Sequence, residues 1–144
     1  MVFVIPAPAV AAIRSHAAAE YPREGCGLLV GRDRSGERRV AYAVPTRNDH
    51  PQAARRYTIA PEDLLIAEKQ ARQAGLEVVG FYHSHPDVDP RPSASDTTAA
   101  WPHYTYVIVG VRAGRAGEIA AWRLRGEELV AEPLEVTAES EARS

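Results

Sequence analysis

The sequence predicts one mixed α/β domain, and three observations favour this fold class. Short apolar runs, rich in valine and isoleucine, recur along the chain and are typical of buried strands. Between two of these runs, residues 62–74 divide into an apolar and a polar face, as in an amphipathic helix. The 144 residues are enough to bury a core, and they contain no internal repeat or domain linker. We therefore expect a single domain of strands and helices.

The first half of the chain predicts a helix among several strands. Val10, Ile13 and Ala17 recur at helical spacing. Pro8 suits the first turn of this helix, and Pro22 stops it. The runs that we expect to form strands are 2–5, 25–31, 39–44 and 56–60.

The second half continues in the same way. The helix at 62–74 ends at Gly75, a stiff proline-rich loop occupies 87–92, and a helix begins near Ser93 and runs towards Trp101. We expect the domain to span 1–136 and the polar segment 137–144 to be a tail. The expected strands are 77–82, which continues through 83–85, then the hairpin of 104–111 with 118–124, and an edge strand at 129–136.

Composition and charge exclude several classes of protein. A formal net charge of −2 gives no basic stripe, so we expect no nucleic-acid partner. The single cysteine, Cys26, excludes an internal disulfide framework. Pro6 and Pro8 interrupt the apolar N-terminus, and no window approaches the roughly 18 apolar residues of a spanning helix. We expect a soluble, cytoplasmic protein without a membrane partner.

Two histidines stand at the end of an expected strand. Side chains at positions i and i+2 of a strand point to the same face, so His83 and His85 can converge on one ion. Asp96 lies eleven residues beyond His85, in the first turn of a helix, where its carboxylate can return to the same point. Three protein ligands leave one tetrahedral position of zinc open, which is typical of a catalytic site.

Each part of this pattern also has an explanation without a metal. A His-x-His pair occurs by chance, and Ser93-x-x-Asp96 is what a helix N-terminus prefers, with a serine cap and an acid at the third position. Capping by Ser93 and ligation by Asp96 are compatible. Asp87, Asp89 and His103 are weaker rival ligands.

The compound spacing of these residues resembles the signature of the JAMM (MPN-plus) metalloprotease family. That signature is His-(Ser/Thr)-His-Pro, then Ser-x-x-Asp beginning after seven intervening residues; here these parts are His83-Ser84-His85-Pro86 and Ser93-x-x-Asp96. The resemblance covers nearly the whole chain. Within the family, the chain is similar to the short bacterial members, such as the CysO-cysteine peptidases. The resemblance implies a central, mixed, curved sheet flanked by helices, in a layout like that of cytidine deaminases.

The resemblance also implies roles for five residues. One zinc ion per chain would be held by His83, His85 and Asp96. Glu24 precedes a glycine-rich apolar strand, as the family's distant glutamate does, and would move a proton from the attacking water to the leaving amine. Ser93 would donate a hydrogen bond to the oxyanion. The chain is thus expected to be a zinc metallopeptidase or isopeptidase.

The substrate class is implied by the same resemblance. Family members cleave the amide bond after the C-terminal Gly-Gly of ubiquitin or a ubiquitin-like protein. Deubiquitinating members often carry an aromatic or Trp-Leu pair where this chain has Arg91-Pro92, and 144 residues leave little room for their insertions. A ubiquitin-like or sulfur-carrier protein is therefore the expected partner, and a ubiquitin-specific deubiquitinase is the alternative. A homodimer stays open.

Two alternatives come from other classes. A non-catalytic MPN-type interaction module is one, as in family members that lack the metal ligands, and the complete set present here disfavours it. A zinc deaminase is the other, but it needs Pro-Cys-x-x-Cys, and Cys26 is alone. We expect Cys26 to be a small buried residue, and Trp101, Tyr104 and Tyr106 to pack rather than to form a binding platform.

Overall fold

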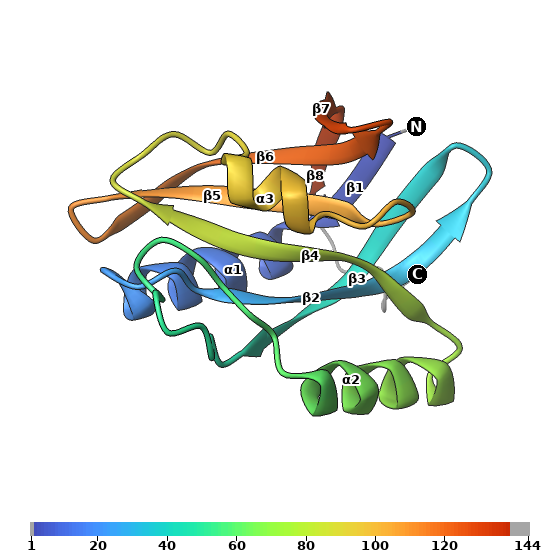
Figure 1. The fold of residues 1–144 in the computed structure, drawn as a ribbon. Helices are drawn as coiled ribbons and strands as arrows, with labels where there is room; N and C mark the ends of the chain where they lie inside the picture. Colours follow the sequence, from blue (N-terminus) through green and yellow to red (C-terminus); the bar gives the residue numbers. More distant parts are fainter. Residues whose placement is uncertain (1, 139–144) are drawn as a thin grey trace.

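The computed structural model describes residues 2–138, and its strands form one eight-stranded sheet in the order β7-β6-β5-β4-β2-β3-β1-β8 (Figure 1). The mixed α/β fold predicted from the sequence is confirmed. The strands are β1 (Val2–Pro6), β2 (Cys26–Arg34), β3 (Glu37–Thr46), β4 (Glu77–Pro86), β5 (Thr105–Arg112), β6 (Arg115–Arg125), β7 (Glu128–Glu132) and β8 (Leu134–Thr137). The helices are α1 (Ala7–Glu20), α2 (Pro61–Gln73) and α3 (Ala94–Ala99).

The sheet is curled, and the cause lies at its two edges. Strand β7 pairs antiparallel with β6 at one end of the sheet, whereas β8 pairs parallel with β1 at the other. Only Pro133 separates β7 from β8, and one residue spans at most about 3.6 Å, so the two edges must approach each other. The prediction of one strand over 129–136 was wrong. A proline cannot donate to a ladder, and Pro133 divides the segment; its carbonyl accepts from the backbone N–H of Phe3 at 2.9 Å.

Each face of the sheet carries its own core. Side chains alternate along β2, so Leu29 packs on one face and Leu28 on the other. The first face buries Ile13 of α1, and the second buries Ala67 and Ala71 of α2. The two longer helices therefore cover different faces, while α3 is drawn across β5 in Figure 1.

Strand β4 lies at the centre of the sheet and carries both histidines near its C-terminal end. It runs parallel to β5 and antiparallel to β2. Because of the antiparallel register, Cys26 at the start of β2 lies opposite His83. The pairing therefore brings the segment just before β2, which contains Glu24, next to the histidines of β4.

Two other predicted elements differ in the structure. Residues 56–60, expected as a strand, belong to a loop. There the N–H of Thr58 donates to Asn48 Oδ1 at 3.1 Å, and its carbonyl accepts from the N–H of Asp49 at 3.1 Å, so its polar groups are satisfied without a sheet. The helix that begins at Ser93 is short, since Ala100 already has extended backbone angles. Thr137 ends β8, and most of the predicted tail, 139–144, lies outside the described residues.

We expect Gly80→Ala to reduce the free energy of unfolding by about 1–3 kcal/mol. A Cβ at Gly80 would lie 2.2 Å from the carbonyl oxygen of Thr105, which would force the parallel strands β4 and β5 apart. Urea unfolding followed by circular dichroism measures the change. Gly117→Ala is the matched control, because a Cβ at Gly117 on β6 would meet no described atom within 4 Å. Equal losses in the two variants would contradict the prediction.

Candidate metal centre

His83, His85 and Asp96 come together in the structure. The Nε2 atoms of the two histidines lie 3.3 Å apart, and Asp96 Oδ2 lies 3.1 Å from His83 Nε2 and 3.0 Å from His85 Nε2. The histidine side chains are buried, with 1% of His83 and 5% of His85 exposed. Among residues 2–138, this is the one group of three or more histidine, cysteine, aspartate or glutamate side chains that lie close enough to share an ion.

Strand alternation and a fixed loop produce this convergence. His83 and His85 project from the same face of β4, and the loop that follows returns the chain to them. Asp87 holds this loop, because its carboxylate accepts from the Tyr21 hydroxyl at 2.6 Å and from the N–H of Ala113 at 2.8 Å. Trp122 Nε1 donates to the carbonyl of Pro90 at 3.0 Å. The loop is thus tied to α1 and to the β5–β6 hairpin before α3 begins.

Neighbouring groups orient both imidazole rings. His85 Nδ1 lies 2.9 Å from the carbonyl oxygen of Asp89, so this nitrogen carries a proton. In the neutral ring the lone pair is then on Nε2, which faces the cluster. The ring of Tyr57 stacks on His83, with centroids 4.4 Å apart and planes 20° apart. Sequence reasoning missed this role of Tyr57, because the alternation around it suggested a strand.

Ser93 and Asp96 form a capping box and also build the cluster. Ser93 Oγ accepts from the N–H of Asp96 at 3.1 Å, and Asp96 Oδ2 accepts from the N–H of Ser93 at 2.9 Å. The same Oδ2 atom faces both histidines. The capping geometry therefore fixes the carboxylate in the orientation in which it meets the histidines.

The cluster shifts the pKa of each of its members. Burial would raise the pKa of Asp96, but hydrogen bonds with His83 and His85 outweigh it and hold that pKa well below its usual range. Burial lowers the pKa of His83. Burial also lowers the pKa of His85, but its bonds to Asp96 and to the Asp89 carbonyl dominate and raise it. An anionic carboxylate and a neutral imidazole, the protonation states that bind metal, are thus favoured in Asp96 and His83.

The donor set fits a metal ion of the zinc type. Ligand atoms about 2.0–2.2 Å from a tetrahedral zinc ion lie about 3.3–3.6 Å from one another, a little wider than the separations of 3.0–3.3 Å found here. Two imidazole nitrogens and one carboxylate also suit iron or manganese. The geometry supports a three-ligand metal site without choosing between these ions.

Glu24 is buried beside this cluster. Only 3% of the residue is exposed, and Oε1 has no hydrogen-bond partner within the described part of the chain. Burial raises the pKa of Glu24 to about 8, partly offset by the positive charge of His85. A carboxyl group with this pKa, held near a metal-binding cluster, has the properties of a proton carrier at neutral pH.

The rival candidates lie elsewhere. Asp87 holds the loop, Asp89 pairs with Arg112, and the exposed His103 packs edge-on against Tyr104. Cys26 is fully buried, as expected, and burial raises the pKa of its thiol to about 11.

A groove of about 820 Å³ reaches the cluster, because Asp96 and the neighbouring Ser95 are among the residues that line it. Trp101 was expected to pack rather than to form a binding platform. That prediction was wrong, because Trp101 is 68% exposed and lines this groove. Helix α3 ends before Trp101. Tyr106 is buried, as expected, and it also lines the groove. The other lining residues are His50, Arg56, Tyr57, Thr58, Ile59, Leu64, Glu68, Phe81, Ala94, Thr98, Ala99 and Tyr104.

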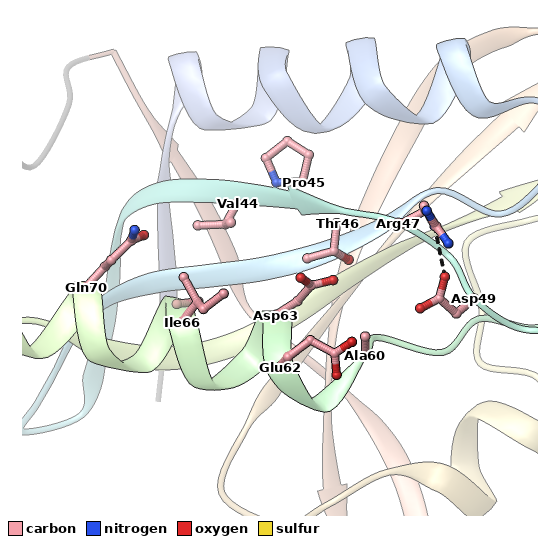
Figure 2. A pocket seen from close by; sticks show the side chains of 11 residues that line it. Val44, Pro45, Thr46, Arg47, Asp49, Ala60, Glu62, Asp63, Ile66 and Gln70 are labelled. Carbon is pink, nitrogen blue, oxygen red and sulfur yellow. Dashed lines mark hydrogen bonds and ion pairs between the residues drawn. The ribbon is translucent and has the colours of Figure 1, made fainter.

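A second cleft, of about 510 Å³, lies between the end of β3 and α2 (Figure 2). Arg47 and Asp49 form an ion pair at its rim, with a distance of 3.0 Å between Nε and Oδ1. The described residues that line it include none of the cluster residues and not Glu24. This cleft is therefore separate from the candidate metal centre.

Comparison with known proteins places the chain in a family. Residues 6–125 match the family described as prokaryotic homologs of the JAB domain. The chain belongs to this family. The JAMM resemblance and the short prokaryotic type predicted from the sequence are thereby confirmed, and this JAB-domain protein is a hydrolytic enzyme of the JAMM type.

The named relatives of this JAB-domain protein include a desampylase and a probable conjugate-cleaving protease. It is 42% identical over 96 residues to the desampylase of Haloferax volcanii, covering 66% of this chain and 68% of that one. It is 35% identical over 116 residues to a Thermus thermophilus protein named as a probable TtuB-protein conjugate cleaving protease, covering 81% and 75%. A solution structure of a Desulfitobacterium hafniense protein superposes with a TM-score of 0.87 at 26% identity, over 97% and 96% of the two chains. Among residues 2–138, no helix has the length and apolar character needed to cross a membrane.

We expect zinc to raise the melting temperature of this JAB-domain protein, because a ligand that binds only the folded state stabilises it, by about 2.7 kcal/mol at 100 times its Kd. His83→Ala and Asp96→Ala should lose both the bound metal and the shift. His103→Ala should keep both, since His103 lies outside the cluster. Elemental analysis of the purified proteins for zinc, iron and manganese, with thermal unfolding before and after chelation, measures this. A wild-type protein that neither retains metal nor responds to it would refute the site.

Proposed function

We propose that this protein is a zinc-dependent peptidase or isopeptidase that cleaves the amide bond after the C-terminal Gly-Gly of a ubiquitin-like or sulfur-carrier protein. The observation that carries the proposal is the position of Glu24. Its carboxyl group is buried, has an oxygen without a hydrogen-bond partner among the described residues, and lies within electrostatic reach of His85 and Asp96. A proton-carrying group is thus combined with a three-ligand metal site in one place.

The proposed chemistry divides the work between the metal and Glu24. A zinc ion held by His83, His85 and Asp96 would supply Lewis acidity and a nucleophilic water at neutral pH. Glu24 takes the proton of the attacking water and passes it to the leaving amine, so one carboxyl group serves as base and then as acid. Burial raises the pKa of Glu24 and a bound cation would lower it again, and these opposing effects bring both protonation states within reach near neutral pH.

Ser93 is proposed to stabilise the oxyanion. A hydroxyl group has one hydrogen to donate and two lone pairs. Ser93 Oγ uses one lone pair to accept the N–H of Asp96. Ser93 Oγ also lies 3.1 Å from Ser95 Oγ, so its hydrogen is available when the Ser95 hydroxyl is the donor of that bond. A donor aimed at a developing oxyanion contributes on the order of a hundredfold to the rate.

The burial of the site supports a slim substrate. Since His83, His85 and Glu24 are almost fully buried, the scissile bond must reach deep into the protein, which residues without side chains do most easily. The groove that Asp96 lines has a volume of about 820 Å³ and is rich in aromatic side chains, which suits the segment that precedes a Gly-Gly end. The name of the Thermus relative, a cleaving protease for TtuB-protein conjugates, agrees with a carrier conjugate as substrate.

Glu24→Gln should retain metal but lower kcat by roughly 10²- to 10⁴-fold, because the amide cannot accept the proton of the water. A purified carrier protein joined through Gly-Gly to a lysine side chain or a peptide is the substrate, and mass spectrometry follows its cleavage. Glu20→Gln is the control, since Glu20 is paired with His16 on α1 at 3.9 Å. Unchanged turnover in Glu24→Gln would remove Glu24 from the mechanism. Equal cleavage of Ala-Ala-ended conjugates would refute the Gly-Gly requirement.

Trp101→Ala should raise KM about tenfold with little change in kcat, because an exposed aromatic side chain in a groove contributes to binding more than to chemistry. Steady-state kinetics on the same conjugates measures KM and kcat separately. The same measurement on ubiquitin conjugates distinguishes a carrier-protein substrate from ubiquitin. Leu65→Ala is the control and should leave KM unchanged, since Leu65 is similarly exposed and is not among the groove residues. A change in kcat alone would place Trp101 outside substrate binding.

A further inference from the structure

The Glu24 carboxyl group is held in place through its backbone. Its Oε1 atom makes no hydrogen bond within residues 2–138, so the contacts of that oxygen do not fix its direction. Glu24 also lies just before β2, outside the regular sheet ladder. The position of the Glu24 carboxyl group must therefore depend on the contacts that hold the main chain of Glu24 and Gly25.

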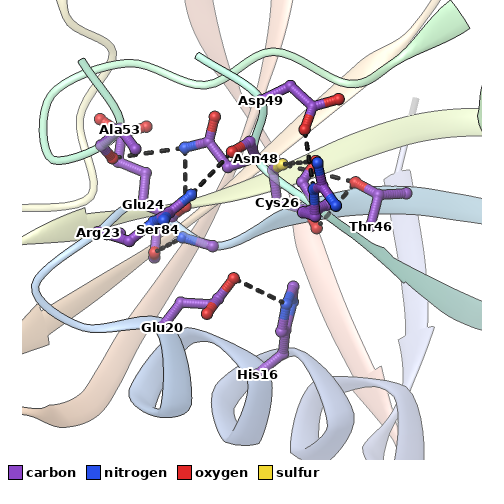
Figure 3. Close-up of polar contacts among 12 residues, drawn as sticks. His16, Glu20, Arg23, Glu24, Cys26, Thr46, Asn48, Asp49, Ala53 and Ser84 are labelled. Carbon is purple, nitrogen blue, oxygen red and sulfur yellow. Dashed lines mark hydrogen bonds and ion pairs between the residues drawn. The ribbon is translucent and has the colours of Figure 1, made fainter. Parts of the chain in front are cut away.

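All four polar backbone groups of Glu24 and Gly25 are hydrogen-bonded (Figure 3). The N–H of Glu24 donates to the carbonyl of Ala53 at 2.7 Å, and its carbonyl accepts from Asn48 Nδ2 at 3.0 Å. The N–H of Gly25 donates to Ser84 Oγ at 2.7 Å, and its carbonyl accepts from the N–H of Ser84 at 2.9 Å. Two of the four partners are side chains, those of Asn48 and Ser84.

Asn48 connects Glu24 with the loop that follows β3. The residue is 2% exposed, and its Nδ2 also donates to the carbonyl of Arg56 at 2.9 Å. Its Oδ1 accepts the N–H groups of His50 and Thr58 at 3.0 and 3.1 Å. The loop is thus folded around one carboxamide, and the residue between Arg56 and Thr58 is Tyr57, whose ring stacks on His83.

Ser84 connects Glu24 with the histidine strand. It is fully buried and stands between His83 and His85 on β4, so its side chain points to the face opposite theirs. Its hydroxyl and its backbone N–H both bind Gly25. Because Ser84 lies between the two histidines on β4, its two bonds to Gly25 set the distance from the Glu24 backbone to both histidines.

We propose that Asn48 and Ser84 are positioning residues that hold the Glu24 carboxyl group at the metal-binding cluster by fixing its backbone from two sides. The inference rests on the role proposed for Glu24. Neither side chain would touch the substrate. Loss of either should let the carboxyl group shift, and a misplacement of about 1 Å can cost on the order of a hundredfold in rate.

The test compares Asn48→Ala and Ser84→Ala with wild type. We expect kcat to fall about 10- to 100-fold with KM within about twofold, while metal content stays the same. In a Glu24→Gln background, neither substitution should reduce kcat further, since there is no longer a carboxyl group to position. Asp49→Ala is the control in the same loop: its carboxylate pairs with Arg47, and its kcat should be unchanged. Assays run below the melting temperature of each variant.

Additive losses in the Glu24→Gln background would overturn the proposal, and so would an unchanged kcat in both folded single variants. Amide hydrogen exchange at Glu24 and Gly25 gives a readout that needs no turnover. Exchange should be at least about tenfold faster in both variants than in wild type and Asp49→Ala, and unchanged exchange would also refute positioning. If wild type cleaves no Gly-Gly conjugate, the proposed function fails, while the exchange data still decide whether these side chains hold the Glu24 backbone.

Discussion

The antiparallel pairing of β2 with β4 is the constraint on which the rest of the site depends. It sets Cys26 opposite His83 and so places Glu24 beside two histidines that are far from it in sequence. The other parts of the candidate site lie close to β4 in the chain, as Ser93 and Asp96 do, or contact it, as Tyr57 does by stacking on His83. A change of one residue in this register would turn the two histidines to the other face of the sheet, because strand side chains alternate with a period of two.

Several polar groups are buried in this region at a cost in stability. Glu24 Oε1 and His83 Nδ1 have no hydrogen-bond partner among the described residues, and burial raises the pKa of Glu24. Unsatisfied buried groups are rare in folded proteins and are concentrated where function requires them. The pattern agrees with a site that holds a cation, because a nearby positive charge would stabilise the ionised forms of Glu24 and Asp96.

Two irregular segments give the site its precision. The loop after β3 is folded around Asn48, and the loop after β4 is tied by Asp87 and by the carbonyl of Pro90. Neither segment has regular secondary structure, but each has its polar groups bonded to fixed partners. Loops of this kind can carry functional side chains with nearly the accuracy of a strand, because their backbone hydrogen bonds leave them few alternative conformations.

The sequence by itself determined the elements with strong periodicity and the local motifs. The helix predicted at 62–74 and the strand predicted at 77–85 correspond to α2 and β4, because their patterns extend over many residues. His83, His85, Ser93 and Asp96 lie close enough in the chain to be connected by spacing. Only the tertiary structure decided what depends on partners far along the chain. It showed that 56–60 is a loop, that Pro133 divides the last strand between two sheet edges, and that Trp101 lines a groove. Glu24 could be chosen among the acids only through family resemblance, because its buried place beside the histidines arises from the pairing of two strands, and strand pairing leaves no local signal in the sequence.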